Sequence, residues 1–271
     1  MIKRFLLAVY VGLLCVTATC LGNTVENKTE NRNDNPIARY DPTKPQRAFT
    51  HSHNKIRYWI FLPQKYGIEQ REWPLVMFLH GAGERGKGLE SLRQNVQINF
   101  LQPTQSVDEL NELPFIVVAP QCPAKQHWIR SQIRGVLDEV LQFCSIDMKR
   151  IYLTGHSMGA FGTWKFASTY PDLFAAIVPV SGGGQTAVVK NLIDIPTWAF
   201  HGEKDTVVPP RRSTSLVNVL KIVGGDAKVT LLPKLGHSIC RETYSRPELW
   251  QWLLSKEKSS DIRMSYAGTA E

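Results

Sequence analysis

Residues 151–170, which read IYLTGHSMGAFGTWKFASTY, decide the fold and contain the strongest motif of the chain. The first three residues are apolar and typical of a buried parallel strand, whereas residues 160–170 can form a helix. Between them lies GHSMG, a GxSxG pattern at a sharp strand-to-helix turn. A side chain at either glycine would collide with the neighbouring strand or helix. We therefore expect a strained Ser157 whose hydroxyl is exposed above the sheet.

Short apolar runs alternate with segments of helical period on both sides of this stretch. The predicted strands are 56–62, 75–79, 115–119, 151–153, 176–180, 197–200 and 228–232. An apolar stripe at helical spacing predicts a helix over 133–144 and another over 216–223, which Gly224 ends. A last helix is predicted from Ser245, because Glu248 follows it at the spacing of a capping box. This alternation predicts an α/β fold with an open, mostly parallel sheet and helices on both faces.

A serine nucleophile needs a base, and the base needs an orienting acid. In this type of fold the chain order is serine, then aspartate or glutamate, then histidine. Only His201 and His237 follow Ser157 in the sequence, and an acid in the 203–205 loop has only His237 after it. Asp205 lies past the carboxyl end of a predicted strand, where such sheets gather their chemistry. We predict the triad Ser157, Asp205 and His237, with Glu203 as the alternative acid.

Acyl chemistry also needs N–H donors for the developing oxyanion. One is expected from Met158, the residue after the nucleophile, and the other from Ala82 in the loop HGAGERG at 80–86. The glycines of this loop, Gly83 among them, let the backbone approach a substrate closely. The same loop could be a phosphate loop, but it lacks the GKS or GKT ending.

These motifs together resemble the α/β-hydrolase superfamily over roughly residues 47–255. They are HGAGERG, PQCP with the following Trp128, GHSMG, HGEKD and the GH pair that ends at His237. The sequence is similar to secreted esterases related to dienelactone hydrolases, polyhydroxybutyrate depolymerases and feruloyl or acetyl esterases, a branch often described as prolyl-oligopeptidase-like. The resemblance implies the α/β-hydrolase fold, the three triad roles given above and the Ala82 and Met158 oxyanion donors. It also implies that Trp128 lines the acyl or leaving-group pocket, although packing over the sheet edge explains that tryptophan equally well.

The predicted function is therefore that of a serine hydrolase that cleaves carboxylic esters through an acyl-enzyme, without a cofactor or metal. Two alternatives are a serine peptidase of the prolyl-oligopeptidase type and a non-catalytic binding protein with the hydrolase fold. The expected substrate is a small-molecule or polysaccharide-linked ester. The loop between the strands that end near 181 and begin at 197 is too short for a lipase-type lid. Short or small aromatic acyl groups are therefore expected, unless the 89–113 segment forms a substitute wall.

Residues 1–22, MIKRFLLAVYVGLLCVTATCLG, have the cations, apolar run and small residues of a secretory signal. Secretion or export to a periplasm is expected, without a stable membrane span after cleavage. An uncleaved anchor and lipid attachment at Cys20 are the alternatives. A polar arm over 23–46, a catalytic domain over 47–255 and a mobile tail over 256–271 complete the predicted organisation.

Composition and cysteine usage exclude several other classes of protein. The formal charge is +8, and loss of the signal would lower it to about +6 with the cations scattered, which argues against nucleic-acid binding. Cys122, Cys144 and Cys240 allow at most one internal disulfide, and no cysteine or histidine cluster has the spacing of a zinc site.

Overall fold

One sheet organises the part of the chain described by the computed structural model, which comprises residues 46–50 (backbone only), 55–63, 65–97 and 114–258. The chain divides into two units, Met1–Asp34 and Asn35–Glu271, and every described residue lies in the second. The predicted signal, Cys20 and nearly all of the predicted arm lie outside the described residues, as does the tail beyond 258.

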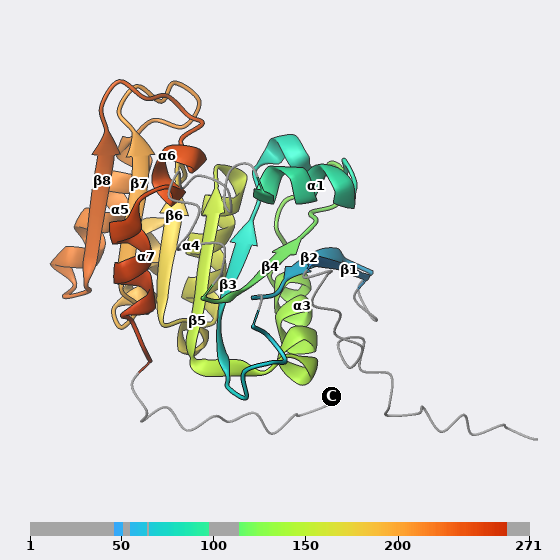
Figure 1. The fold of residues 1–271 in the computed structure, drawn as a ribbon. Helices are drawn as coiled ribbons and strands as arrows, with labels where there is room; N and C mark the ends of the chain where they lie inside the picture. The colour runs from blue at the N-terminus through green and yellow to red at the C-terminus, as the bar shows by residue number, and fades with distance from the viewer. Residues whose placement is uncertain (1–45, 51–54, 64, 98–113, 259–271) are drawn as a thin grey trace, which may run out of the picture. The chain divides into compact units, whose positions relative to one another are not determined.

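Within these residues eight strands pair in the order β1-β2-β4-β3-β5-β6-β7-β8 (Figure 1). Their bounds are Gln46–Thr50 (β1), Arg57–Phe61 (β2), Trp73–Leu79 (β3), Ile116–Pro120 (β4), Ile146–His156 (β5), Ala176–Val180 (β6), Thr197–Gly202 (β7) and Ala227–Leu232 (β8). Strand β1 pairs with β2 and β2 with β4 in antiparallel fashion, whereas the remaining pairs are parallel. Every residue of β3, β4, β6 and β7 is buried, which explains why these strands are almost entirely apolar in sequence.

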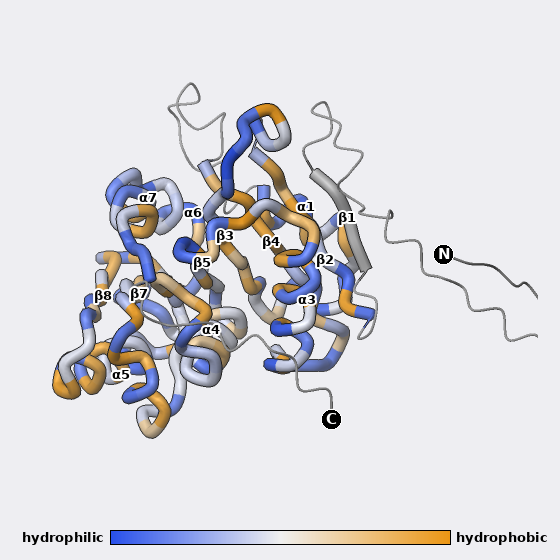
Figure 2. Tube along the Cα trace, turned by 90° about the horizontal axis from the view of Figure 1, so that it is seen from below, coloured by the Kyte–Doolittle hydropathy of each residue, from blue (hydrophilic) through white to orange (hydrophobic). Residues whose placement is uncertain are grey.

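Helices cover both faces of the sheet. One face packs against α3 (Arg130–Phe143), α4 (Met158–Thr169) and α5 (Arg211–Ile222). The other packs against α1 (Leu89–Val96), α6 (Cys240–Tyr244) and α7 (Pro247–Leu254), of which α6 and α7 lie in front of the sheet in Figure 1. In Figure 2 the central strands are mostly apolar, while α5 and α7 alternate apolar and polar residues along their turns. This alternation is that of helices with one face on the core.

The sequence-based elements largely agree with this fold. All seven predicted strands are present, and Gly224 follows the C-cap of α5 with φ of +95°, as a helix-ending glycine should. Strand β1 and helix α6 were not predicted. The capping box at Ser245 was wrong: Arg246 is the N-cap of α7, and the Ser245 hydroxyl donates to the Glu242 carbonyl at 3.4 Å. The reason is that Ser245 is the C-cap of α6, so its hydroxyl bonds the last turn of that helix and does not cap the first turn of α7.

The C-terminal end of the described residues is held by specific contacts. The Tyr152 hydroxyl donates to the Lys256 carbonyl at 2.8 Å, and the Lys258 N–H donates to the Lys149 carbonyl at 3.0 Å. Cys122, Cys144 and Cys240 are buried free thiols. Among the helices in the described ranges, none has the length and apolar character needed to cross a membrane.

Candidate active site

Ser157 occupies the sharp turn between β5 and α4 and is the N-cap of that helix, with φ of 54° and ψ of −116°. A positive φ is strained for a residue with a side chain. A Cβ at Gly155 would lie 2.7 Å from the Leu79 carbonyl oxygen, and one at Gly159 would lie only 1.8 Å from the same atom. Close approach of β3 therefore requires both glycines, as the sequence predicted.

The loop after β8 brings His237 to this serine. The His237 Nε2 atom lies 2.8 Å from Ser157 Oγ, and its Nδ1 atom lies 2.7 Å from Asp205 Oδ2. The acidic side chain comes from the loop after β7. Three loops at the carboxyl ends of parallel strands thus bring together a hydroxyl, an imidazole and a carboxylate, from the three residues that the chain order singled out.

Asp205 is buried and fully hydrogen-bonded. Its Oδ1 atom accepts from the Val207 and Val208 N–H groups, each at 2.9 Å, while Oδ2 faces His237. Burial by itself would raise the pKa of Asp205, but the hydrogen bonds from His237 and the two backbone groups outweigh it and place the pKa below its ordinary value. The carboxylate is therefore held in its charged form. Glu203, the alternative acid, is exposed to solvent.

His156, the residue before Ser157, contacts the loop that carries His237. Its Nε2–H donates to the His237 carbonyl at 3.0 Å, and the two rings lie 5.0 Å apart. Burial lowers the pKa of His156, because desolvation disfavours the charged ring, and the hydrogen bond to the His237 carbonyl opposes this shift only in part. A neutral His156 holds the loop of His237 without adding a second positive charge.

The predicted oxyanion loop lies beside the serine. Ala82 begins a short 3₁₀ helix, Ala82–Glu84, and Met158 is the first residue of α4. The first N–H groups of a helix lack intrahelical acceptors, so both are available to a ligand. Gly83 is exposed, and nothing in the protein lies within 4 Å of where its Cβ would be. The described part of the chain therefore imposes no steric need for glycine at that position.

A buried histidine that the sequence analysis missed anchors this loop. His80 Nε2 accepts from the Cys122 N–H at 2.9 Å, and Nδ1–H donates to the Gly81 carbonyl at 2.7 Å. Burial lowers the pKa of His80 to about 4, so the ring is neutral. Gln121 completes the link by donating to the Glu84 carbonyl at 2.7 Å. The signal was the position of His80 directly after a buried strand and before the glycine-rich run.

A cavity of about 440 Å³ opens beside the serine hydroxyl. It is lined by His127, Trp128, Ser157, Met158, Phe161, Gly162 and Lys165. Trp128 lines this cavity, and its Nε1–H donates to the His80 carbonyl at 3.2 Å. The walls of this cavity are mainly apolar and aromatic. Lys165 contributes a cationic group, and none of the lining residues named above is acidic.

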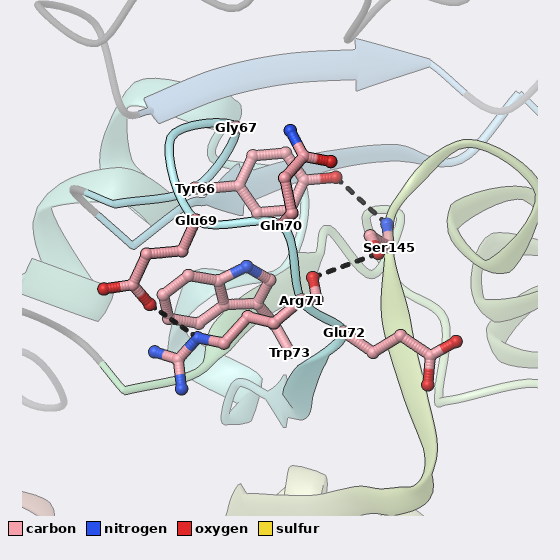
Figure 3. Close-up of a pocket in the computed structure, with 8 residues that line it drawn as sticks. All are labelled: Tyr66, Gly67, Glu69, Gln70, Arg71, Glu72, Trp73 and Ser145. Atoms are coloured by element: carbon pink, nitrogen blue, oxygen red, sulfur yellow. Dashed lines mark hydrogen bonds and ion pairs between the residues drawn. The ribbon is translucent and has the colours of Figure 1, made fainter.

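A second cavity, of about 420 Å³, lies at the opposite ends of β3 and β5 (Figure 3). Its polar groups bind one another: Tyr66 Oη accepts from the Ser145 N–H at 3.0 Å, and Ser145 Oγ donates to the Arg71 carbonyl at 3.2 Å. Arg71 pairs with Glu69 at 2.8 Å and lies 3.6 Å over the Trp73 ring. No group of metal-binding side chains occurs at either cavity or elsewhere in the residues that the structure describes.

The comparisons with known proteins agree with this geometry. A family model described as Phospholipase/Carboxylesterase matches residues 124–246, which include all three aligned side chains. Poly(3-hydroxyalkanoate) depolymerase C of Paucimonas lemoignei is 32% identical over 115 residues, 41% of this chain and 28% of that protein. Acetylxylan esterase A of Aspergillus ficuum is 27% identical over 121 residues, 38% of this chain and 40% of that protein.

Among solved structures, a thermostable esterase is 32% identical and superposes with a TM-score of 0.72, covering 80% of this chain and 64% of that one. The fold is therefore that of the α/β-hydrolases, and the similarity to the esterase branch is confirmed. The chain spans less than half the length of the curated relatives named above.

Proposed function

We propose that the chain is a serine hydrolase that cleaves carboxylic esters through an acyl-enzyme. The observation that carries this proposal is the continuous line of hydrogen bonds from Ser157 Oγ through His237 to Asp205 Oδ2. A serine hydroxyl is a weak nucleophile unless an adjacent base removes its proton as it attacks. The matched names among relatives, esterases and a depolymerase, support the same chemistry.

In the first half-reaction Ser157 Oγ attacks the ester carbonyl carbon while its proton passes to His237 Nε2. Asp205 stays ionised, holds the imidazole in the Nδ1–H tautomer and stabilises the imidazolium. The tetrahedral oxyanion accepts hydrogen bonds from the Ala82 and Met158 N–H groups. The C–O bond to the alcohol then breaks, and His237 returns the proton to the departing oxygen.

In the second half-reaction a water molecule replaces the alcohol. His237 takes a proton from the water as its oxygen attacks the acyl carbon, and the bond to Ser157 Oγ breaks as the proton returns to the serine. The products are a carboxylic acid and the free enzyme. None of these steps uses a metal or an organic cofactor.

The substrate we propose is a small-molecule or polysaccharide-linked ester with a short or small aromatic acyl group. Trp128, Met158 and Phe161 give the cavity the aromatic and apolar surface such a group would contact. The segment between β6 and β7 forms a short 3₁₀ helix, Thr186–Leu192, whose Val189 and Leu192 are buried in the core. Those apolar residues are committed to packing and cannot cover a long acyl chain.

We further propose that residues 1–22 direct the chain out of the cytoplasm, so that the enzyme acts on extracellular or periplasmic esters. The known relatives include an acetylxylan esterase and a polyhydroxyalkanoate depolymerase, whose names denote polymer substrates. Cleavage of the signal is measured as the N-terminal residue of the protein recovered after export.

The experiment that tests the activity compares kcat/KM on acetyl, butyryl, feruloyl and dodecanoyl esters and on peptide substrates. We expect the acetyl, butyryl or feruloyl esters to be best, because each methylene left in water forfeits about 0.8 kcal/mol of transfer energy. Stoichiometric labelling of Ser157 by a fluorophosphonate identifies the nucleophile independently of the substrate. Faster peptide cleavage would favour the peptidase alternative, and absence of labelling would favour a binding protein.

A further inference from the structure

A second histidine touches the carboxylate of the aligned side chains, and the triad chemistry proposed above does not use it. His201 lies near the end of β7 and is completely buried. Its Nε2 atom lies 2.8 Å from the Val208 carbonyl oxygen and 3.1 Å from Asp205 Oδ2. Its Nδ1 atom lies 2.7 Å from Ser213 Oγ on α5.

The groups that face the ring nitrogens are all hydrogen-bond acceptors. Nε2 faces a carbonyl oxygen and a carboxylate oxygen, and Nδ1 faces the Ser213 hydroxyl oxygen, whose own proton is donated to the Gly182 carbonyl. The Nε2–H points to the Val208 carbonyl, and its positive end also faces Asp205 Oδ2. His201 therefore presents a buried N–H dipole to the acid of the triad.

Asp205 Oδ2 is the atom that His237 also uses. It lies 2.7 Å from His237 Nδ1 and 3.1 Å from His201 Nε2, so two imidazoles share one oxygen. A carboxylate oxygen that faces a second donor has less negative charge to offer the first. Asp205 and His237 are also contacted by the Val207 and Val208 N–H groups at Oδ1, by Ser157 Oγ at His237 Nε2 and by the neutral His156 ring beside His237.

The same ring connects the acid loop to the segment behind the nucleophile. Ser213 Oγ, which holds the Nδ1 edge of His201, donates to the Gly182 carbonyl at 2.9 Å. Gly182 packs so closely on the serine turn that a Cβ there would lie 3.1 Å from the Ser157 carbonyl oxygen. His201 thus lies in a buried polar chain that runs from Asp205 to the backbone beside Ser157.

Resting on the proposed function, we propose that His201 is a positioning residue that acts through Asp205: it fixes the carboxylate and limits how strongly that carboxylate stabilises the protonated form of His237. An unopposed Asp205 would hold the imidazolium too tightly for proton return to the leaving alcohol. Sharing Oδ2 with His201 keeps His237 able both to accept and to release a proton.

The central test is the pH dependence of kcat/KM in His201→Phe. Phenylalanine fills the space but cannot donate to Asp205, so the imidazolium of His237 gains stability. We expect the acid limb of the profile to move to higher pH by about half a unit or more, with an approximately tenfold fall in the plateau value. His201→Gln, whose amide can donate to Asp205, should return the limb part of the way.

Two further variants separate positioning from mere structure. Ser213→Ala keeps the His201 ring but removes the hydroxyl that contacts its Nδ1 atom. The acid limb of the pH profile should therefore move to higher pH by less than in His201→Phe. If His201→Phe does not fold, the result with Ser213→Ala decides whether the proposal holds. Tyr66→Phe removes a hydrogen bond at the opposite end of the sheet and should leave the limb in place. A lowered plateau with an unmoved acid limb in both His201→Phe and Ser213→Ala would overturn the proposal.

A second readout does not depend on the substrate. In protein labelled with ¹⁵N-histidine, the pH at which the His237 ring titrates is measured by NMR in wild type and His201→Phe, with the resonance assigned by loss in His237→Gln. A higher titration midpoint in His201→Phe supports the proposal, and an unchanged midpoint refutes it. If wild type hydrolyses no ester, the proposed function fails while this comparison still decides the role of His201.

Discussion

The two ends of strands β3 and β5 carry cavities of nearly equal size but opposite character. At the amino ends, Tyr66, Ser145, Arg71 and Glu69 bind one another, and the Trp73 ring is covered by a guanidinium (Figure 3). At the carboxyl ends, the hydrogen bonds from Asp205 and His237 lead to one partly exposed hydroxyl beside an open cavity. Both ends are rich in polar groups, so polarity alone does not identify the site.

Strain distinguishes the two ends. At the carboxyl end Ser157 has a positive φ, and the residues two before and two after it must be glycines, because a Cβ at either position would collide with the Leu79 carbonyl oxygen. The amino-end contacts join groups in ordinary geometry and stabilise a turn. Strained backbone that persists beside a reactive group is characteristic of functional sites, because the surrounding fold must compensate for its cost. Variants at the two ends should therefore separate activity from stability.

The largest expected effect is that of Ser157→Ala on esterase activity. Removing the hydroxyl eliminates the nucleophile while leaving the packing almost unchanged, so kcat should fall on the order of 10⁶-fold with the melting temperature preserved. The measurement is kcat on the best ester, with thermal unfolding of the same preparation as control. A kcat within tenfold of wild type would exclude this residue as the nucleophile.

Asp205→Asn should have the next largest effect. An asparagine at this position favours the wrong tautomer of His237, and losses on the order of 10⁴ in kcat follow from that change in a related constellation. Glu203→Gln is the matched control, because it neutralises an exposed acid in the same loop. Comparable losses in both variants would mean that the charge of the loop, not the carboxylate at His237, matters.

The residues that form the site could be predicted because each belongs to a local pattern. A strand, a GxSxG turn and the order of the later acid and histidine are all sequential, and parallel strands bring their carboxyl ends together. Strands β3, β4, β6 and β7 were predicted for a similar reason, since burial on both faces leaves continuous apolar runs. Strand β1, which reads QRAFT, has no continuous apolar run and so gave no such signal, although its partner β2 is the next strand in the chain.

The supporting groups could not be predicted from local pattern. His80 directly follows buried strand β3 and His201 lies near the end of buried strand β7, and their partners come from elsewhere in the chain, Cys122 in one case and Ser213 in the other. The capping box at Ser245 failed for the converse reason, because a correct spacing was overridden by a helix that ends at the same residue. Tertiary contacts decided these cases.

Gly159→Ala should unfold or strongly destabilise the protein. The new Cβ would lie 1.8 Å from the Leu79 carbonyl oxygen, and neither the β3 backbone nor α4 can move without disturbing the turn that holds Ser157. We expect a loss of about 3 kcal/mol or more in the free energy of unfolding, measured with denaturant. Gly83→Ala, where the Cβ meets nothing within 4 Å, should change that free energy by less than about 0.5 kcal/mol.

The low pKa of Asp205 predicts a stability difference that depends on pH. The folded-state pKa lies below the ordinary value of 3.8, so the charged carboxylate stabilises the fold fully above that pH, and its contribution is lost as the pH falls through the lower folded value. Wild type should therefore lose stability more steeply than Asp205→Asn on acidification. Parallel acid-unfolding curves for the two proteins would contradict the assignment.

The smallest effect on activity should come from Tyr66→Phe at the amino ends, and it is the most direct test of the comparison. The variant removes the acceptor for the Ser145 N–H, a net loss of about 1 kcal/mol in the free energy of unfolding, because the ring still packs beside Trp73. Strand β3 leads from this cavity to the oxyanion loop, and β5 leads from it to the serine turn. If the lost hydrogen bond affected the active site through these strands, kcat/KM would change. We expect kcat/KM to stay within about twofold, since the close-packed and fully buried strand β3 separates the two ends. A larger fall in kcat/KM, measured well below the unfolding temperature, would show that the amino-end contacts also tune the active site.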